Sequence, residues 1–200
     1  TVVRFDTTHT YGESDGKFED VTMTKSYEDL VDVITWAKTQ ACYEEPFVLV
    51  GHSMGGMCSA LYAEENSEQV KACAPIATTV SGDSYFNTFS KEVREQWKKT
   101  GWRQWESTAY PGMMKRLPYA FVADRFQYDL MPKVERLRMP VLMIVGSKDT
   151  ATPPEIQRVF YEKIPGKKEF HVIEGATHAF PHSKHREEIK TIFAKWIETL

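Results

Sequence analysis

The sequence lacks a long hydrophobic run and an excess of charge of either sign. No apolar run approaches the roughly 20 residues of a membrane-spanning helix, and the chain does not open like a signal peptide. There are 25 Lys and Arg residues against 28 Asp and Glu, with no basic stripe and no acidic tail. Nothing in this balance favours nucleic acid or an anionic membrane as a partner, so we expect neither.

Cysteine is also scarce, and the spacing of the cysteines follows no paired motif. The three residues, Cys42, Cys58 and Cys73, are odd in number and form no C-x-x-C motif. This usage is typical of reduced structural thiols and predicts a cytoplasmic protein without a thiolate metal site. The 200 residues contain no repeat and no low-complexity tract, so residues 1–200 are expected to form a single domain.

The apolar segments that are present alternate between two periodicities. Short apolar runs predict buried strands, and amphipathic segments between them predict helices. This alternation predicts an α/β fold, a mostly parallel sheet with helices on both faces. The expected strands cover residues 2–5, 47–50, 70–76, 141–145 and 170–173, and the expected helices begin at 26, 54 and 153 and close the chain.

Capping signals indicate where some helices begin. Ser26 with Asp29 resembles a capping box, and Thr152 is the expected N-cap of a helix with Pro153 in its first position and Glu155 completing the box. The apolar stripe of the closing helix consists of Ile189, Ile192, Phe193, Trp196, Ile197 and Leu200.

One segment interrupts the alternation. Between Ser84 and Leu130 the periodicity is helical but irregular, and this stretch holds 11 of the 25 Phe, Tyr and Trp residues. A solvated linker would not contain so many aromatic side chains. We therefore expect residues 81–130 to form an inserted cap subdomain, in which most of the rings build the insertion's own small core.

The segment Gly51-His52-Ser53-Met54-Gly55 fits the pattern G-x-S-x-G, with an expected strand before it and a helix after it. Such a tight turn forces the serine into a strained backbone conformation and exposes its hydroxyl above the sheet. Ser53 is therefore the expected nucleophile, and the backbone N–H of Met54, at the positive end of the helix, is the expected oxyanion donor.

A serine hydroxyl needs a base to take its proton and an acid to orient that base. Asp149 and His178 each follow the carboxyl end of a late predicted strand, at the sheet edge where Ser53 also lies. These two residues are therefore the expected acid and base.

Other acids and histidines fit these roles less well. Asp124 and Asp129 lie in or beside the expected cap, and Glu174 is too close to its strand to reach across. His182 and His185 have the spacing of a metal pair, but solvent-facing side chains are the favoured interpretation. The remaining histidines are expected to pack (His52), alternate in a strand (His171) or border the site without a role (His9).

With these residues assigned, the chain resembles serine esterases of the α/β-hydrolase superfamily, and within it the bacterial feruloyl and cinnamoyl esterases, monoacylglycerol lipases and serine aminopeptidase-like hydrolases. The segments "VGHSMGG", "MPVLMIVGSKDTATPP" and "IEGATHAF" carry the likeness. It implies the roles given above for Ser53, Asp149, His178 and Met54, and hydroxycinnamoyl esters as substrates.

The chain departs from this family at its start. "THTYGES" stands where the family has a Gly-His-Gly turn, and the chain opens at the family's fourth strand, without the loop that supplies the second oxyanion donor. A longer native protein is the favoured explanation, ahead of a second chain or an impaired enzyme. The open strand edge at Val2–Phe5 suggests a homodimer.

Together these features predict a hydrolase of small apolar or aromatic acyl esters that needs no cofactor and no metal. An acyltransferase, a perhydrolase or a thioesterase could use the same residues. A silent scaffold or binding protein is the alternative of another class.

Overall fold

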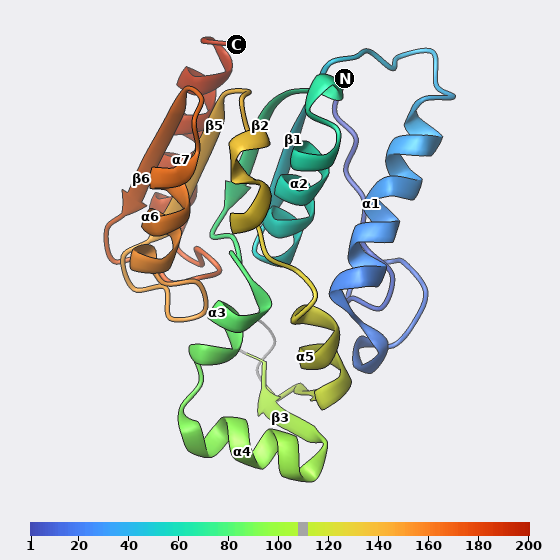
Figure 1. Ribbon diagram of the computed structural model, residues 1–200, viewed down its shortest axis with the longest axis vertical. Coiled ribbons are helices and arrows are strands. Elements are labelled where there is room, and N and C mark those ends of the chain that lie inside the picture. Colours follow the sequence, from blue (N-terminus) through green and yellow to red (C-terminus); the bar gives the residue numbers. More distant parts are fainter. Residues whose placement is uncertain (108–111) are drawn as a thin grey trace. The chain divides into compact units, whose positions relative to one another are not determined.

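The computed structural model describes residues 1–107 and 112–200 and divides the chain into two compact units (Figure 1). One unit consists of Glu44–Thr88 and Asp129–Leu200, and the other of Thr1–Tyr43 and Phe89–Tyr128. Each unit therefore combines segments that are distant in the sequence.

A parallel sheet forms the centre of the first of these units. Its strands are β1 (Phe47–His52), β2 (Val70–Ile76), β5 (Val141–Gly146) and β6 (Lys168–Ile173), which lie side by side in the order β1-β2-β5-β6 (Figure 1). The pairs β1–β2, β2–β5 and β5–β6 are all parallel. The predicted α/β architecture is confirmed, because these four strands are the apolar runs expected from the sequence.

Helices cover both faces of this sheet. Helix α7 (Ser183–Ile197) packs Trp196 and most of its apolar stripe against one face, which includes Ala74 of β2 and Ile144 of β5. Helix α2 (Met54–Glu65) contacts β1 and β2, and α6 (Pro154–Lys163) contacts β5 and β6. The expected stripe of α7 is wrong at Ile197, which is 57% exposed. The remaining elements of the unit are η2 (Ser67–Gln69), α3 (Gly82–Asn87) and η3 (Met131–Arg136).

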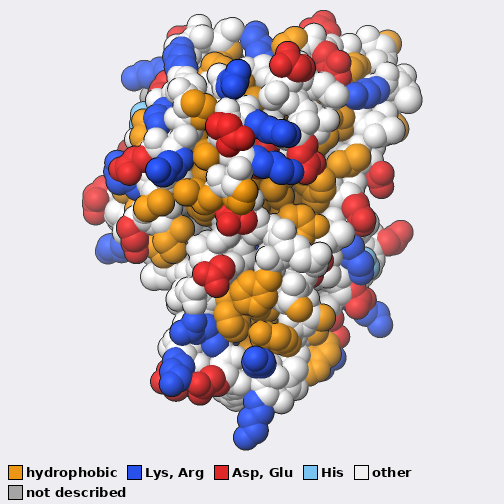
Figure 2. Space-filling model, in the orientation of Figure 1, with side chains coloured by type: hydrophobic (Ala, Val, Ile, Leu, Met, Phe, Trp, Pro, Cys, Tyr) orange, Lys and Arg blue, Asp and Glu red, His pale blue; other side chains and the backbone are white. Residues whose placement is uncertain are grey.

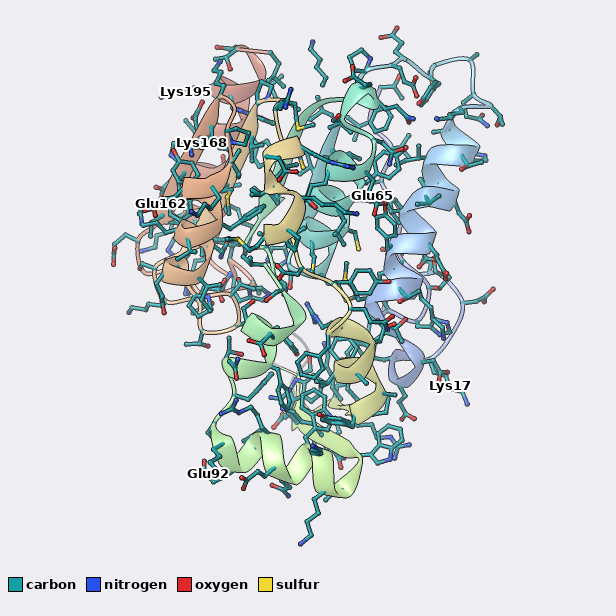
Figure 3. The ribbon with its side chains drawn as sticks, in the orientation of Figure 1. Lys17, Glu65, Glu92, Glu162, Lys168 and Lys195 are labelled. Carbon is teal, nitrogen blue, oxygen red and sulfur yellow. The ribbon has the colours of Figure 1, made fainter. Side chains whose placement is uncertain are left out.

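Lys168 joins the end of α6 to the start of β6. Its ammonium group donates to the carbonyls of Tyr161, Glu162 and Ile164 at 2.8, 3.0 and 2.7 Å, and Figure 3 labels it near Glu162. These carbonyls lie at the C-terminal end of α6, which carries partial negative charge. One lysine thus satisfies helix-end acceptors and fixes the turn into β6.

The strand expected at Val2–Phe5 is wrong. These residues belong to no strand, and Val2 is 92% exposed, because no described strand lies beside them to form a ladder. Within the described residues β1 pairs only with β2, so it forms an edge of the sheet. Val48 and Val50 of β1 are 39% and 56% exposed.

The second unit contains η1 (Phe18–Asp20), α1 (Met23–Ala37), α4 (Lys91–Thr100), the antiparallel strands β3 (Trp102–Glu106) and β4 (Met114–Pro118), and α5 (Tyr119–Arg125). The N-cap expected at Ser26 is wrong. Thr22 caps α1 by accepting the Lys25 N–H, while the Ser26 hydroxyl bonds back to the Thr22 carbonyl inside the helix.

The β3–β4 hairpin was not expected from the irregular helical pattern. The guanidinium of Arg103 lies over the rings of Phe89 and Trp105 at 4.5 Å each, and Trp97 donates its indole N–H to the Leu117 carbonyl. Aromatic rings therefore do build a local core here. That residues 81–130 form a cap over the site stays a prediction.

The surface carries both signs of charge. On the face drawn in Figure 2, acidic and basic side chains are interspersed. Among the described helices none is long and apolar enough to cross a membrane.

Candidate functional site

The structure brings the three expected residues together at the carboxyl ends of three strands. Ser53 follows β1, Asp149 follows β5 and His178 follows β6. The Ser53 Oγ lies 2.9 Å from His178 Nε2, and His178 Nδ1 lies 2.8 Å from Asp149 Oδ2. Hydroxyl, imidazole and carboxylate thus form one continuous hydrogen-bonded chain.

The backbone at Ser53 has φ 58° and ψ −118°, a region that a side chain with a Cβ rarely adopts. The neighbouring chain holds it there. The Ser53 N–H donates to the Ile76 carbonyl at 2.9 Å, and the Ser53 carbonyl accepts the Met57 N–H at 3.2 Å. A Cβ at Gly51 would collide with the carbonyl of Gly55, whereas Gly55 has open space around it. Gly51 is thus the glycine that this turn requires.

Met54 is the first residue of α2. Its N–H lies among the backbone donors that the helix cannot satisfy internally, at the positive end of the helix dipole. An anion formed next to Ser53 would therefore meet a donor and a favourable field.

Asp149 is 3% exposed, and burial alone would raise the pKa of its carboxyl group. Hydrogen bonds from His178 and from both the backbone and the side chain of Thr152 outweigh this effect, so the pKa of Asp149 is lowered. The carboxylate is therefore ionised over the whole neutral range and can hold a protonated imidazole.

Thr152 is not the N-cap of α6, contrary to the expectation. Pro153 occupies that position and the helix begins at Pro154. The Thr152 hydroxyl turns instead toward Asp149 Oδ2 at 2.8 Å and the Ala77 carbonyl at 3.0 Å. The signal that could have found this contact is the D-x-x-T spacing, since an Asp side chain readily accepts backbone N–H groups two and three residues ahead.

His52 was expected to pack, but it also makes a specific bond. Its Nε2–H donates to the backbone carbonyl of His178 at 2.8 Å, and its ring lies 4.8 Å from the His178 ring and 6.0 Å from Phe180. Desolvation by the surrounding protein, followed by the neighbouring His178, lowers the pKa of His52. The neutral ring ties the end of β1 to the loop that carries His178.

The rival acids have other partners. Asp124 accepts the N–H groups of Met23 and Thr24 at the start of α1, Asp129 accepts the Met131 N–H, and Glu174 accepts the Ser147 hydroxyl at 3.2 Å.

The other histidines also lie outside the hydrogen-bonded chain. His171 pairs with Glu169 at 3.0 Å, and His9 accepts the Lys17 N–H. The expectation of solvent-facing rings at His182 and His185 is wrong for His185, which is 2% exposed because it packs inward near the start of α7. No group of three or more His, Cys, Asp or Glu residues suited to a metal occurs among the described positions.

A sequence profile described as the "Alpha/beta hydrolase family" matches residues 1–190. The chain belongs to this family.

An uncharacterized 31.7 kDa protein of Escherichia coli is 25% identical over 84% of this chain and 70% of its own length. The mitochondrial palmitoyl-protein thioesterase ABHD10 of Bos taurus is 28% identical over 76% of this chain and 48% of its own. Among solved structures, Est1E of Butyrivibrio proteoclasticus with bound ferulic acid has a TM-score of 0.73 at 23% identity, covering 94% of this chain and 74% of that one. Membership of the family makes this protein an alpha/beta hydrolase, and a thioesterase is among the proteins it is similar to.

Proposed function

We propose that the protein is a serine hydrolase that cleaves carboxylic esters through an acyl-enzyme on Ser53. The observation that carries the proposal is the unbroken chain from Ser53 Oγ through the imidazole of His178 to Asp149, with separations of 2.9 and 2.8 Å. These distances lie within the range in which a base can take a proton from a nucleophile.

In the proposed reaction, His178 Nε2 takes the Ser53 proton while Oγ attacks the ester carbonyl. Asp149 keeps the proton of the imidazole on Nδ1 and stabilises the imidazolium that forms. The Met54 N–H donates to the oxyanion. His178 then protonates the leaving alcohol, and a water molecule repeats the sequence on the acyl group to free Ser53.

For the substrate we propose a small apolar or aromatic acyl ester. Est1E, whose fold this chain shares, is described with bound ferulic acid, an aromatic acid. A thioester is the second candidate, favoured by the likeness to a palmitoyl-protein thioesterase. The two share one acyl-enzyme and differ only in the leaving group, so paired esters and thioesters of the same acid would separate them.

Labelling with a fluorophosphonate probe tests the proposed nucleophile. We expect stoichiometric modification of Ser53 in the folded protein, and none in Ser53→Ala. Ser147→Ala is a matched control, since its hydroxyl contacts Glu174 and Gly175 rather than His178. Two outcomes would overturn the proposal. One is folded wild-type protein that the probe does not label, and the other is a Ser53→Ala variant that hydrolyses p-nitrophenyl butyrate as fast as the wild type.

A further inference from the structure

The carboxylate of Asp149 is occupied by protein donors on both oxygens. Oδ1 accepts the N–H groups of Ala151 and Thr152 at 2.9 Å each, and Oδ2 accepts the Thr152 hydroxyl and His178 Nδ1–H at 2.8 Å each. A carboxylate offers about four acceptor sites, so this one needs no water. Thr152 supplies two of the four donors.

The Thr152 hydroxyl competes with the imidazole for the same oxygen. It has one proton, which can go to Asp149 Oδ2 or to the Ala77 carbonyl 3.0 Å away. Its oxygen also lies 3.3 Å from His178 Nδ1. When the hydroxyl donates to Oδ2, it weakens the attraction between the carboxylate and the imidazole. When it donates to the Ala77 carbonyl instead, that attraction is stronger.

The backbone of Thr152 is fixed from the far side. The Gln157 amide donates to the Thr152 carbonyl at 2.6 Å and accepts the Thr78 N–H at 3.1 Å. Gln157 is fully buried and Thr152 is 5% exposed. The hydroxyl is therefore held in one place, where the described residues offer its proton two oxygen acceptors, Asp149 Oδ2 and the Ala77 carbonyl.

Building on the proposed function, we propose that Thr152 is a positioning residue whose hydroxyl sets how strongly Asp149 holds the protonated imidazole of His178. Among the described residues, the titratable groups facing that imidazole are Asp149 and His52. Without the hydroxyl, the full charge of Oδ2 acts on the imidazole, so His178 keeps its proton to a higher pH and is a base over a narrower range. Thr152 would thus tune the reaction without touching the substrate.

Thr152→Val tests this proposal, because it removes the hydroxyl and nearly keeps the shape. We expect the acid limb of the pH profile of kcat/KM to move up by about half a pH unit, a fraction of the roughly one to two pH units that correspond to a whole hydrogen bond to a charged group, because the hydroxyl acts on the imidazole only through the carboxylate. We expect kcat to fall by up to about threefold near neutral pH, with KM little changed, because half a pH unit changes the fraction of deprotonated imidazole by at most that factor. Thr152→Ser, which keeps the hydroxyl, should restore both values.

Gln157→Met is the matched control for a purely structural effect. It removes the bond to the Thr152 carbonyl but leaves every donor to Asp149 in place, so we expect lower stability with an unmoved pH profile. A profile that moves equally in Gln157→Met and Thr152→Val, or in neither, would refute the tuning role. Should the valine variant fail to fold, Thr152→Ala against Thr152→Ser gives the same comparison.

Nitrogen-15 NMR titration of the His178 imidazole separates this proposal from the proposed function. The ring should titrate at higher pH in Thr152→Val than in the wild type, whether or not esters are hydrolysed. An inactive wild type with this shift would refute the hydrolase and keep the positioning role. An active wild type whose His178 titration is the same in both proteins would refute the positioning role alone.

Discussion

Glu64 is a buried carboxyl group without a hydrogen-bond partner among the described residues, and it makes stability depend on pH in an unusual direction. It lies on α2 and is 1% exposed, and neither carboxylate oxygen has a hydrogen-bond partner in the described part of the chain. Burial raises its pKa from 4.5 to about 8, with Lys133 opposing and Glu135, Glu65 and Asp129 adding to the shift. The folded protein therefore keeps a proton that the unfolded chain releases.

The magnitude follows from the difference between the two pKa values. Below pH 4.5 both states are protonated, and the group has no effect on the free energy of unfolding. Between pH 4.5 and about 8 only the unfolded chain loses its proton, so the free energy of unfolding falls as pH rises. At about 1.4 kcal/mol per pH unit, the full loss is at most about 5 kcal/mol. Local relaxation makes about 2–4 kcal/mol a realistic expectation.

Glu64→Gln removes the charge and keeps the shape. We expect it to match the wild type near pH 5 and to exceed it by about 2–4 kcal/mol at pH 9. Urea unfolding at pH 5, 7 and 9, followed by tryptophan fluorescence, measures the difference. Subtracting the two curves cancels the other titrating groups.

Glu65→Gln is the matched control, since Glu65 is its neighbour on α2 (Figure 3) and pairs with Lys133 at 3.8 Å while 43% exposed. An exposed pair contributes about 1 kcal/mol or less, so the control should show little dependence on pH. A difference between wild type and Glu64→Gln that stays constant within about 0.5 kcal/mol from pH 5 to 9 would refute the assignment of a buried, protonated carboxyl group.

Three further predictions follow from other contacts. Lys168→Met should lower the free energy of unfolding by about 1–3 kcal/mol, since three carbonyls lose their donor, and equal urea midpoints for wild type and variant would contradict this. Thr22→Ala should lower the free energy of unfolding by about 1 kcal/mol in the same assay, and Ser26→Ala should lower it distinctly less, because Thr22 is the N-cap of α1. A larger effect of Ser26→Ala would support the N-cap expected from the sequence. The lowered pKa of Asp149 stabilises the folded state above about pH 4, and this stabilisation is lost as the pH falls through the pKa of Asp149 in the folded protein. The free energy of unfolding of Asp149→Asn should therefore depend less steeply on pH in acid than that of the wild type.

The sequence was most informative where one pattern had one structural outcome. The run Val141–Val145 is apolar throughout and became the fully buried strand β5, and the glycine-flanked Ser53 became the tight turn between β1 and α2. Asp149 and His178 could be paired with Ser53 because parallel strands present their carboxyl ends at one edge.

Predictions failed where a local signal had two outcomes. Thr152 fits an N-cap, yet the buried carboxylate of Asp149 offered its hydroxyl a stronger acceptor. The residues Val2–Phe5 have the composition of a strand, but a strand needs a neighbour to pair with, and composition does not supply one. The β3–β4 hairpin was missed because its alternation is short and mixes rings with charges.

The bond from the His52 ring to the His178 backbone has a dynamic consequence. It links the end of β1, next to the nucleophile, to the backbone carbonyl of the residue that carries the base, so a displacement of one segment should be transmitted to the other. This tie favours a constant separation between Ser53 Oγ and His178 Nε2, the two atoms between which the proton moves in the proposed reaction.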